Sequence, residues 1–177
     1  MEKIGIAGIG GIGSNVARHL VQAGIKDIVI VDFDLVEASN LNRQFYRFSQ
    51  IGGKKTDCLE RNLKDISPGI NIEKIDRKIE PGDSKKIFSC CDIVVEGFDN
   101  KIMKKTIIEE LAETCGLLVS ASGIAGDDMD CITTKKIGNC HIVGDFISDT
   151  DNCHIFPPKI ALISSVMAGI VLKHALI

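Results

Sequence analysis

The chain has 177 residues, of which 45% are apolar, and its 21 Lys and Arg against 24 Asp and Glu give a formal charge of -3. This length and apolar content predict a single domain, residues 1–177, with a core that needs no disulfide or metal to be stable. The near balance of charge excludes the strongly basic surface of a typical nucleic-acid-binding protein, so no nucleic-acid partner is expected.

The cysteines and the apolar tail indicate where the protein resides. An odd number of cysteines without a secretory leader predicts reduced thiols and a cytoplasmic location. The most apolar segment, 160–177, is interrupted by Lys173 and His174 and is shorter than the about 20 apolar residues of a membrane span. We expect a buried terminal helix and no membrane partner. The seven cysteines are Cys58, Cys90, Cys91, Cys115, Cys131, Cys140 and Cys153.

Residues 3–32 have the pattern of a strand, a helix and a second strand. Residues 3–8 are a short apolar run bounded by glycines, and 13–23 show helical spacing that ends at Gly24. Residues 27–32 are a continuous run of Ile and Val between two aspartates, as in a strand that is covered on both faces of a parallel sheet. This is a βαβ unit.

The rest of the chain continues the alternation. Helices are predicted at 53–66, 81–89, 101–115 and from Pro157-Pro158 onward, and strands at 71–76, 92–96 and 117–122. Residues 130–137 and 140–144 are predicted to form an antiparallel pair that turns at Gly138-Asn139. The sequence therefore predicts an α/β fold: a Rossmann-like, doubly wound, mostly parallel sheet with helices on both faces and an antiparallel addition near the C-terminus.

The first turn, Gly8-Ile9-Gly10-Gly11-Ile12-Gly13, satisfies the pattern G-x-G-x-x-G and adds a glycine at Gly11. Without side chains, the backbone N–H groups at a helix start can approach a phosphate closely. Asp32, nineteen residues past Gly13, ends the second strand, where a carboxylate can accept hydrogen bonds from ribose hydroxyls. The pattern indicates a nucleotide with a ribose and suits an NAD(P)-dependent enzyme equally well; the alternative is a turn that serves packing alone.

The loop after Asp32 carries more hydrogen-bonding groups than a turn requires. Arg43 offers a planar fork of donors to phosphate oxygens, and Asn40 can bond the same group or hold the loop. In Gly52-Gly53-Lys54-Lys55, Lys55 can reach a phosphate, but both lysines are equally consistent with a solvated surface. A triphosphate explains this set of side chains better than a dinucleotide does.

Four segments in a fixed order carry a family resemblance: GIGGIGSN, DFDLVEASNLNRQ, the G-x-x-K of residues 52–55, and EGFDN at 96–100. Together they resemble the ThiF, MoeB and HesA family of adenylyltransferases, which is related to ubiquitin-activating enzymes, over about the first 125 residues. The tail from Ala121 onward, including PPKIALISSVMAGIVL, resembles the compact form of ThiF that activates a thiamine-pathway sulfur carrier, ThiS.

The resemblance implies a reaction and a set of site residues. It implies transfer of AMP from ATP to the C-terminal Gly-Gly carboxylate of a small ubiquitin-like sulfur-carrier protein, with release of pyrophosphate, by a homodimer in thiamine (thiazole) biosynthesis. Asp32 would bind the ribose, Asp99 would hold magnesium, and Arg43, Lys55 and Asp99 would be the catalytic residues. The residues implied to bind ATP are Gly8, Gly10, Gly11, Gly13, Asp32, Asn40, Arg43 and Lys55.

The chain also departs from the family, and rival functions stay open. Many relatives carry two C-x-x-C pairs that bind structural zinc, whereas the Cys and His spacing here predicts no structural zinc site. The first strand begins at about residue 3, so the arginine that longer relatives lend to a neighbouring subunit is expected to be missing or supplied elsewhere. Without the resemblance, Asp99 would be predicted to cap a helix beside Asn100. The rivals are an NAD(P)-dependent Rossmann oxidoreductase and a non-catalytic module that binds nucleotide or carrier.

Overall fold

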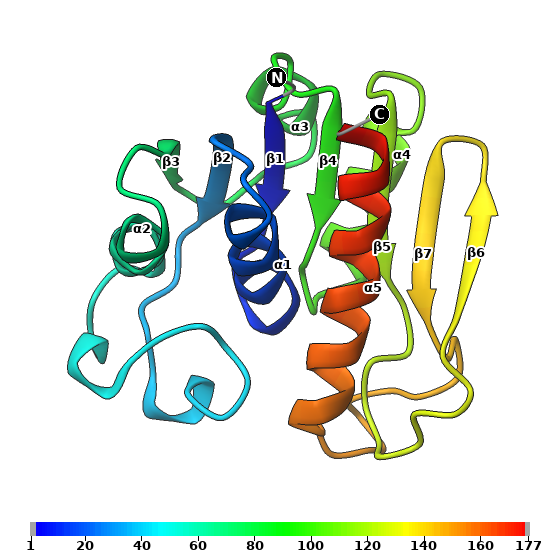
Figure 1. The fold of residues 1–177 in the computed structure, drawn as a ribbon. Coiled ribbons are helices and arrows are strands. Elements are labelled where there is room, and N and C mark those ends of the chain that lie inside the picture. Colours follow the sequence, from blue (N-terminus) through cyan, green and yellow to red (C-terminus); the bar gives the residue numbers. More distant parts are fainter. Residues whose placement is uncertain (1–2, 176–177) are drawn as a thin grey trace.

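A computed structural model describes residues 3–175 and contains a seven-stranded sheet flanked by helices (Figure 1). The strands are β1 Ile4–Ala7, β2 Asp27–Asp32, β3 Asn71–Asp76, β4 Ile93–Glu96, β5 Leu117–Ala121, β6 Thr133–Ile137 and β7 Cys140–Gly144. The α-helices are α1 Gly11–Gln22, α2 Lys55–Ile66, α3 Ser84–Ile87, α4 Lys101–Leu111 and α5 Pro157–Ala175. Two short 3-10 helices, η1 Ala38–Asn40 and η2 Phe48–Gln50, lie between β2 and α2.

The strand order is β3-β2-β1-β4-β5-β7-β6. All neighbouring pairs are parallel except β6 and β7, which are antiparallel. The predicted Rossmann-like fold and its antiparallel addition are confirmed, and β7 joins that addition to the sheet by pairing in parallel with β5. The order of strands reverses between β1 and β4, so the carboxyl ends of these two strands flank the crevice in which open α/β sheets bind ligands.

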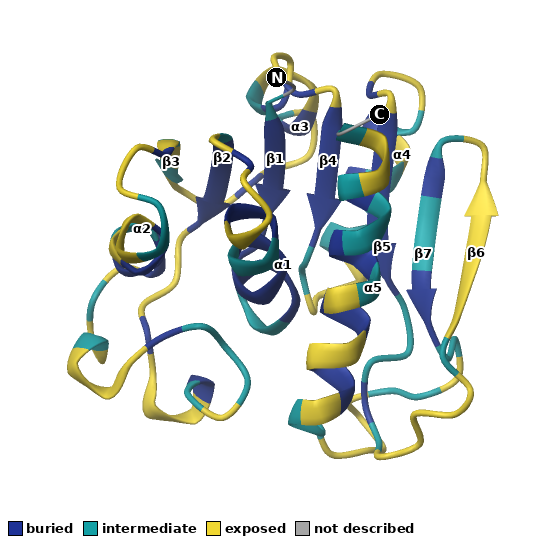
Figure 2. Cartoon of the chain, in the orientation of Figure 1, coloured by how far each residue is buried: buried dark blue, intermediate teal, exposed yellow. Residues whose placement is uncertain are grey.

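The sheet lies between two layers of helices. In Figure 1, α1 and α5 cover one face, and α3 and α4 lie behind the other. Because successive residues of a strand point to opposite faces, Ile28 and Ile30 join the core beneath α1 and α5, whereas Val29 and Val31 join the second core. This explains the continuous apolar run in β2. The central strands are buried, whereas β6 is exposed along its whole length (Figure 2).

The last helix, α5, is long and apolar enough to cross a membrane by length and composition alone. It packs lengthwise against α1 and over β5 and β7, and its inner face lies in the core. This is the arrangement predicted for the terminal helix, except that residues 176 and 177 of the predicted segment lie outside the described residues. The buried residues of α5 are Lys159, Ile160, Ile163, Ser164, Met167, Ala168 and Val171.

The boundaries of four predicted helices were wrong. The helix predicted at 53–66 begins at Lys55, and the helix predicted at 81–89 covers only Ser84–Ile87. The helix predicted at 101–115 ends at Leu111, because the amide of Thr114 donates to the carbonyl of Leu111 and the chain tightens into a turn before Gly116. The first helix begins at Gly11 rather than at residue 13, because the glycine turn already has helical backbone, and Ala23 is exposed beyond its end. The Asn100 side chain caps α4 by accepting hydrogen bonds from two amides of its first turn.

Three backbone segments meet where the first turn closes. A Cβ on Gly13 would lie 1.9 Å from the carbonyl oxygen of Gly8, and a Cβ on Gly97 would lie 2.7 Å from the same oxygen. Gly8 itself has a φ of 81°, which disfavours other residues. The glycines therefore allow β1, the start of α1 and the segment after β4 to approach one another at the head of the crevice.

We expect Gly13→Ala to lower the free energy of unfolding by about 1–3 kcal/mol, because the methyl group meets a backbone oxygen that cannot rotate away. The control is Gly169→Ala in α5, where no atom lies within 4 Å of the new Cβ. There, replacing glycine should raise stability by up to about 1 kcal/mol. Urea unfolding followed by circular dichroism measures both, and an unchanged midpoint for Gly13→Ala would contradict the packing argument.

Candidate functional site

A cavity of about 320 Å³ opens at the carboxyl edge of the sheet, within the size range of small-molecule sites. It is bounded by the glycine turn, the residues that follow β2, β3 and β4, and the start of α5. Gly13 and Asn40, which were also implied to bind ATP, lie outside the lining. The predicted site residues that line the cavity are Gly8, Gly10, Gly11, Asp32, Arg43, Lys55 and Asp99.

The wall of the cavity divides into a charged part and an apolar part. The charged part combines four basic side chains with three acidic ones: Arg43, Lys55, Arg77 and Lys78, with Asp32, Asp34 and Asp99. The apolar part includes the side chains Phe33, Ile79, Phe98, Met103, Ile124, Ile155 and Ile160. A ligand with an anionic group and a flat or aliphatic group would match this division.

Asp32 fastens the glycine turn to the end of β2. It is buried, one carboxylate oxygen accepts from the amide of Ile9 at 2.9 Å, and the other accepts from the amide of Asp34 at 2.9 Å. Burial raises the pKa of Asp32, and the hydrogen bonds from Asp34 and Ile9 and the charge of Lys55 oppose that shift. A carboxylate oxygen has a second lone pair, so both oxygens can still accept a hydrogen bond from a ligand hydroxyl.

The start of α1 offers main-chain donors to the cavity. Gly10 occupies the N-cap position and supplies no side-chain cap. The amide groups of the first helical turn therefore remain available, and the positive end of the helix dipole favours an anion there. Gly10, Gly11 and Ile12 all line the cavity, so this end of α1 is a ready anion site.

Arg43 lies over this helix start. The aliphatic stem of Arg43 lies 3.7 Å from the position that a Cβ on Gly11 would occupy. Its Nη1 donates to the carbonyl of Ser39 at 2.8 Å and to the side chain of Asn42 at 2.9 Å. Within residues 3–175, its Nε and Nη2 donate no hydrogen bond, which leaves one side of the fork for phosphate oxygens.

Three side chains that the sequence analysis missed fasten the Arg43 loop to α1. Asn15 donates to the carbonyl of Gly11 at 2.7 Å and to the carbonyl of Arg43 at 2.8 Å. The Ser14 hydroxyl accepts from the amide of Phe45 at 3.0 Å, and the Tyr46 hydroxyl donates to the carbonyl of Ile9 at 2.8 Å. Ser14 and Asn15 directly follow the glycine motif, and that adjacency is the signal from which they could have been found.

The structure separates the two lysines that the sequence left equivalent. Lys54 is exposed and pairs with Asp76 at the end of β3. Lys55 is buried and lines the cavity, with its Nζ 2.7 Å from a carboxylate oxygen of Asp34. The half-exposed Asp34 also lines the cavity, so Lys55 is a cation held at the wall by a partner that solvent can reach.

Asn40 and Asp99 have different surroundings. The side-chain oxygen of Asn40 accepts from the amide of Glu37 at 3.0 Å, so of its two proposed roles the structure shows the one that holds the loop. A phosphate contact from Asn40 stays a prediction. Asp99 does not cap α4, since Asn100 does; it lines the cavity, and its carboxylate accepts no hydrogen bond from any residue between 3 and 175.

The donor set fits magnesium bound together with a phosphate. Magnesium commonly takes one or two carboxylates from the protein, with water and substrate phosphates as its other ligands. The free carboxylate of Asp99 can supply such a ligand. In the described part of the chain, no three His, Cys, Asp or Glu residues gather as they would to hold a metal by protein ligands alone.

A buried ion pair supports the apolar end of the cavity, and the sequence analysis missed it. The ammonium group of Lys159 donates to the carbonyl of Ala125 at 2.6 Å and to Asp145 at 2.7 Å, and so joins the loops on either side of the β6–β7 pair. Burial acts to raise the pKa of Asp145, but the hydrogen bonds from Lys159 and from the amides of Ile147 and Ser148 hold it well below its usual value.

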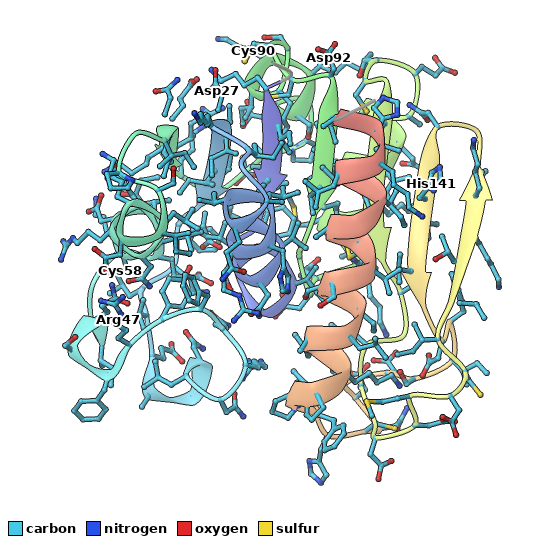
Figure 3. The ribbon with its side chains drawn as sticks, viewed as in Figure 1. Asp27, Arg47, Cys58, Cys90, Asp92 and His141 are labelled. Carbon is cyan, nitrogen blue, oxygen red and sulfur yellow. The ribbon has the colours of Figure 1, made fainter. Side chains whose placement is uncertain are left out.

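The cysteines take no part in this cavity. All seven are free thiols, and none lines it. Burial raises the pKa of Cys91 to about 12 and that of Cys140 to about 11, so both are protonated at neutral pH and are poor nucleophiles. Figure 3 shows Cys90 beside Asp27 and Asp92, at the amino edge of the sheet and opposite the edge that bears the cavity.

Comparison with known sequences identifies relatives of the chain. The sequence model of the ThiF family matches residues 1–176. Adenylyltransferase and sulfurtransferase UBA4 of Candida glabrata is 32% identical over 141 residues, which are 78% of this chain and 33% of that protein. Molybdopterin-synthase adenylyltransferase of Haemophilus influenzae is 30% identical over 124 residues, 70% of this chain and 51% of that protein. The chain thus spans about a third to a half of the length of these relatives.

Solved structures share the fold. The E. coli tRNA N6-threonylcarbamoyladenosine dehydratase TcdA, in complex with AMP, superposes with a TM-score of 0.87 at 21% identity, covering 99% of this chain and 86% of that one. HcgE from Methanothermobacter marburgensis, with guanylylpyridinol and ATP bound, gives a TM-score of 0.80 at 20% identity, covering 98% of this chain and 94% of that one.

We expect Asn15→Ala to loosen the loop between β2 and α2, because the carbonyls of Gly11 and Arg43 lose their shared donor. The free energy of unfolding should fall by about 1–3 kcal/mol, and trypsin should cleave faster after Arg43 and Arg47. The matched control is Asn71→Ala, which removes an exposed contact with Asp27 outside the site. Mass spectrometry of timed digests measures the rates, and equal cleavage of Asn15→Ala and wild type would contradict the role given to Asn15.

Proposed function

The chain belongs to the ThiF family, and from this premise we propose that it is an ATP-dependent adenylyltransferase. It would transfer AMP to the C-terminal carboxylate of a small ubiquitin-like sulfur-carrier protein and release pyrophosphate. One observation carries the proposal: the glycine turn, Asp32, Arg43, Lys55 and Asp99 meet in a single cavity. The names of the two sequence relatives, both adenylyltransferases, support it.

The proposed reaction needs charge stabilisation rather than a base. The carboxyl group of a peptide terminus has a pKa of about 3.3–3.7, so it is already an anion at neutral pH. One of its oxygens forms a bond to the α-phosphorus of ATP, and the bond from that phosphorus to the bridging oxygen breaks. The electron pair leaves with pyrophosphate. Because an anion attacks within a polyanion, fixed positive groups lower the barrier.

The site residues take roles that follow from their positions. Asp32 would accept hydrogen bonds from the ribose hydroxyls, while the amide groups at the start of α1 and the free side of the Arg43 fork would bind phosphate oxygens. Lys55 would meet the phosphates from the opposite wall, exchanging its exposed partner Asp34 for the ligand. Asp99 would hold magnesium, which would neutralise charge on the departing pyrophosphate.

The second part of the proposal names the carrier protein, the pathway and the oligomeric state. We take the carrier to be ThiS-like, with a Gly-Gly end, and the pathway to be thiazole synthesis for thiamine; the resemblance of the tail after Ala121 to compact ThiF supports this. The apolar end of the cavity would accept a chain end without charged side chains. A homodimer in the cytoplasm completes the proposal.

The direct test is intact mass measurement of a carrier after incubation with the protein, ATP and magnesium. We expect a ThiS-like carrier with a Gly-Gly end to gain the mass of one adenylyl group, because its terminal carboxylate is the attacking group. A molybdopterin-pathway carrier, run in parallel, tests the choice of pathway, and a carrier lacking the last glycine is the control. If neither carrier gains AMP, the adenylyltransferase proposal is wrong.

We expect Arg43→Ala and Lys55→Ala each to reduce ATP/pyrophosphate exchange by about 100-fold or more, since each removes a fixed donor from developing charge. The matched control is Lys54→Ala, which removes the adjacent, exposed lysine and should retain most of the activity. Near-normal exchange by either site variant, with its circular dichroism spectrum unchanged, would contradict the role given to that residue.

Thermal unfolding separates the proposal from an oxidoreductase. Because a ligand that binds the folded state stabilises it, ATP with magnesium at about 100 times its Kd should stabilise the protein by about 2.7 kcal/mol. NAD, tested at the same concentration, should leave the Tm unchanged. Stabilisation by NAD alone would favour the oxidoreductase instead.

A further inference from the structure

A buried carboxylate, paired with a partly exposed lysine, lies next to the segment that carries Asp99. Glu96, the last residue of β4, is 0% exposed. One of its carboxylate oxygens accepts from the ammonium group of Lys104 on α4 at 2.5 Å and from the hydroxyl of Ser120 on β5 at 2.6 Å. The other accepts from the amide of Phe98 at 2.7 Å. One carboxylate thus joins β4, β5, α4 and the segment between them.

Stability alone does not explain this pair. Burying the carboxylate of Glu96 carries a large desolvation penalty, which its pairing with the partly exposed Lys104 only offsets, so an apolar residue of the same volume could be equally stabilising. The pair does neutralise itself, because Lys104 compensates the charge of Glu96. The arrangement can therefore fix backbone geometry without adding net charge behind Asp99.

In the short segment 97–100, hydrogen bonds hold each of the other three residues, while Asp99 lies between them. The amide of Gly97 donates to the carbonyl of Ala7 at 2.8 Å, and the amide of Phe98 donates to Glu96. On the other side, Asn100 caps α4 by accepting from the amides of Ile102 and Met103. Asp99 is the residue of this segment whose polar side chain makes no hydrogen bond within residues 3–175, and it lines the cavity.

We propose that Glu96, supported by Lys104 and Ser120, is a positioning residue that aims the carboxylate of Asp99 at magnesium bound with ATP. This inference rests on the proposed function, since it takes magnesium and ATP as the ligand. Glu96 touches neither and acts through the amide of Phe98. Rigid support of this kind matters because magnesium demands near-ideal octahedral geometry from its ligands.

Calorimetric titration with ATP, in excess magnesium and again in EDTA, tests the inference without relying on activity. We expect Glu96→Gln to reduce the gain in ATP affinity that magnesium provides by about tenfold and to leave the affinity in EDTA within about twofold of wild type. Asp99→Asn should lose the same magnesium-dependent gain. The double variant should lose no more of this gain than Asp99→Asn alone, because both changes act on the carboxylate of Asp99 as the magnesium ligand. The matched control is Glu109→Gln, an exposed glutamate on α4.

Ser120→Ala keeps the test decisive if Glu96→Gln does not fold, as judged by circular dichroism. It removes one hydrogen bond to Glu96 and leaves the charged pair in place, so a smaller loss of the same magnesium-dependent gain is expected. Lys104→Arg, which conserves the charge, should retain that gain. Full retention of the gain in Glu96→Gln and Ser120→Ala, with only a lower Tm, overturns the inference, and so do losses that multiply in the double variant.

The same titrations separate this inference from the proposed function. A wild-type protein that does not bind ATP contradicts the proposed function and this inference with it. A wild-type protein that binds ATP with a magnesium-dependent gain, alongside a Glu96→Gln variant with the same gain, contradicts the inference alone.

Discussion

The buried carboxylate of Asp32 is the contact on which the site depends. It accepts the amide of Ile9 from the glycine turn and the amide of Asp34 from the loop after β2, so one side chain sets the distance between these two walls. Asp34 then pairs with Lys55 at the start of α2. A series of direct contacts therefore leads from the glycine turn after β1 to the start of α2, and residues along it line the cavity.

The loop between β2 and α2 is attached to the rest of the fold at several points. Ser14, Asn15 and Tyr46 attach it to the glycine turn and to α1, and the main chain of Arg43 takes part in that attachment. Its guanidinium group is in turn held within the loop by hydrogen bonds to Ser39 and Asn42. In the proposed reaction, a cation held in this way would need little reorganisation when charge develops.

Much of the fold and part of the site could be predicted from the sequence. The Ile and Val run of β2 predicts a strand buried on both faces, and parallel strands bring their carboxyl ends to one edge, so Asp32 and Asp99 meet although 67 positions separate them. The residue types alone could not distinguish Lys54 from Lys55, because the distinction depends on which one faces the core; the G-x-x-K pattern of the family resemblance pointed to Lys55. Nor could the sequence predict the contacts of Asn15 with Arg43 and of Glu96 with Ser120, which join residues 28 and 24 positions apart and exist only in the folded chain.

The exposed strand β6 has a consequence for behaviour in concentrated solution. As the last strand of the sheet, it presents main-chain groups to solvent, and such an edge is a template on which another extended chain can add and start aggregation. Lys135 and Lys136 lie next to each other on it, and because successive side chains of a strand alternate, each face of the edge carries one positive charge. If two such edges approached in an antiparallel manner, like charges would face each other. The two lysines thereby oppose growth of the sheet at its β6 edge.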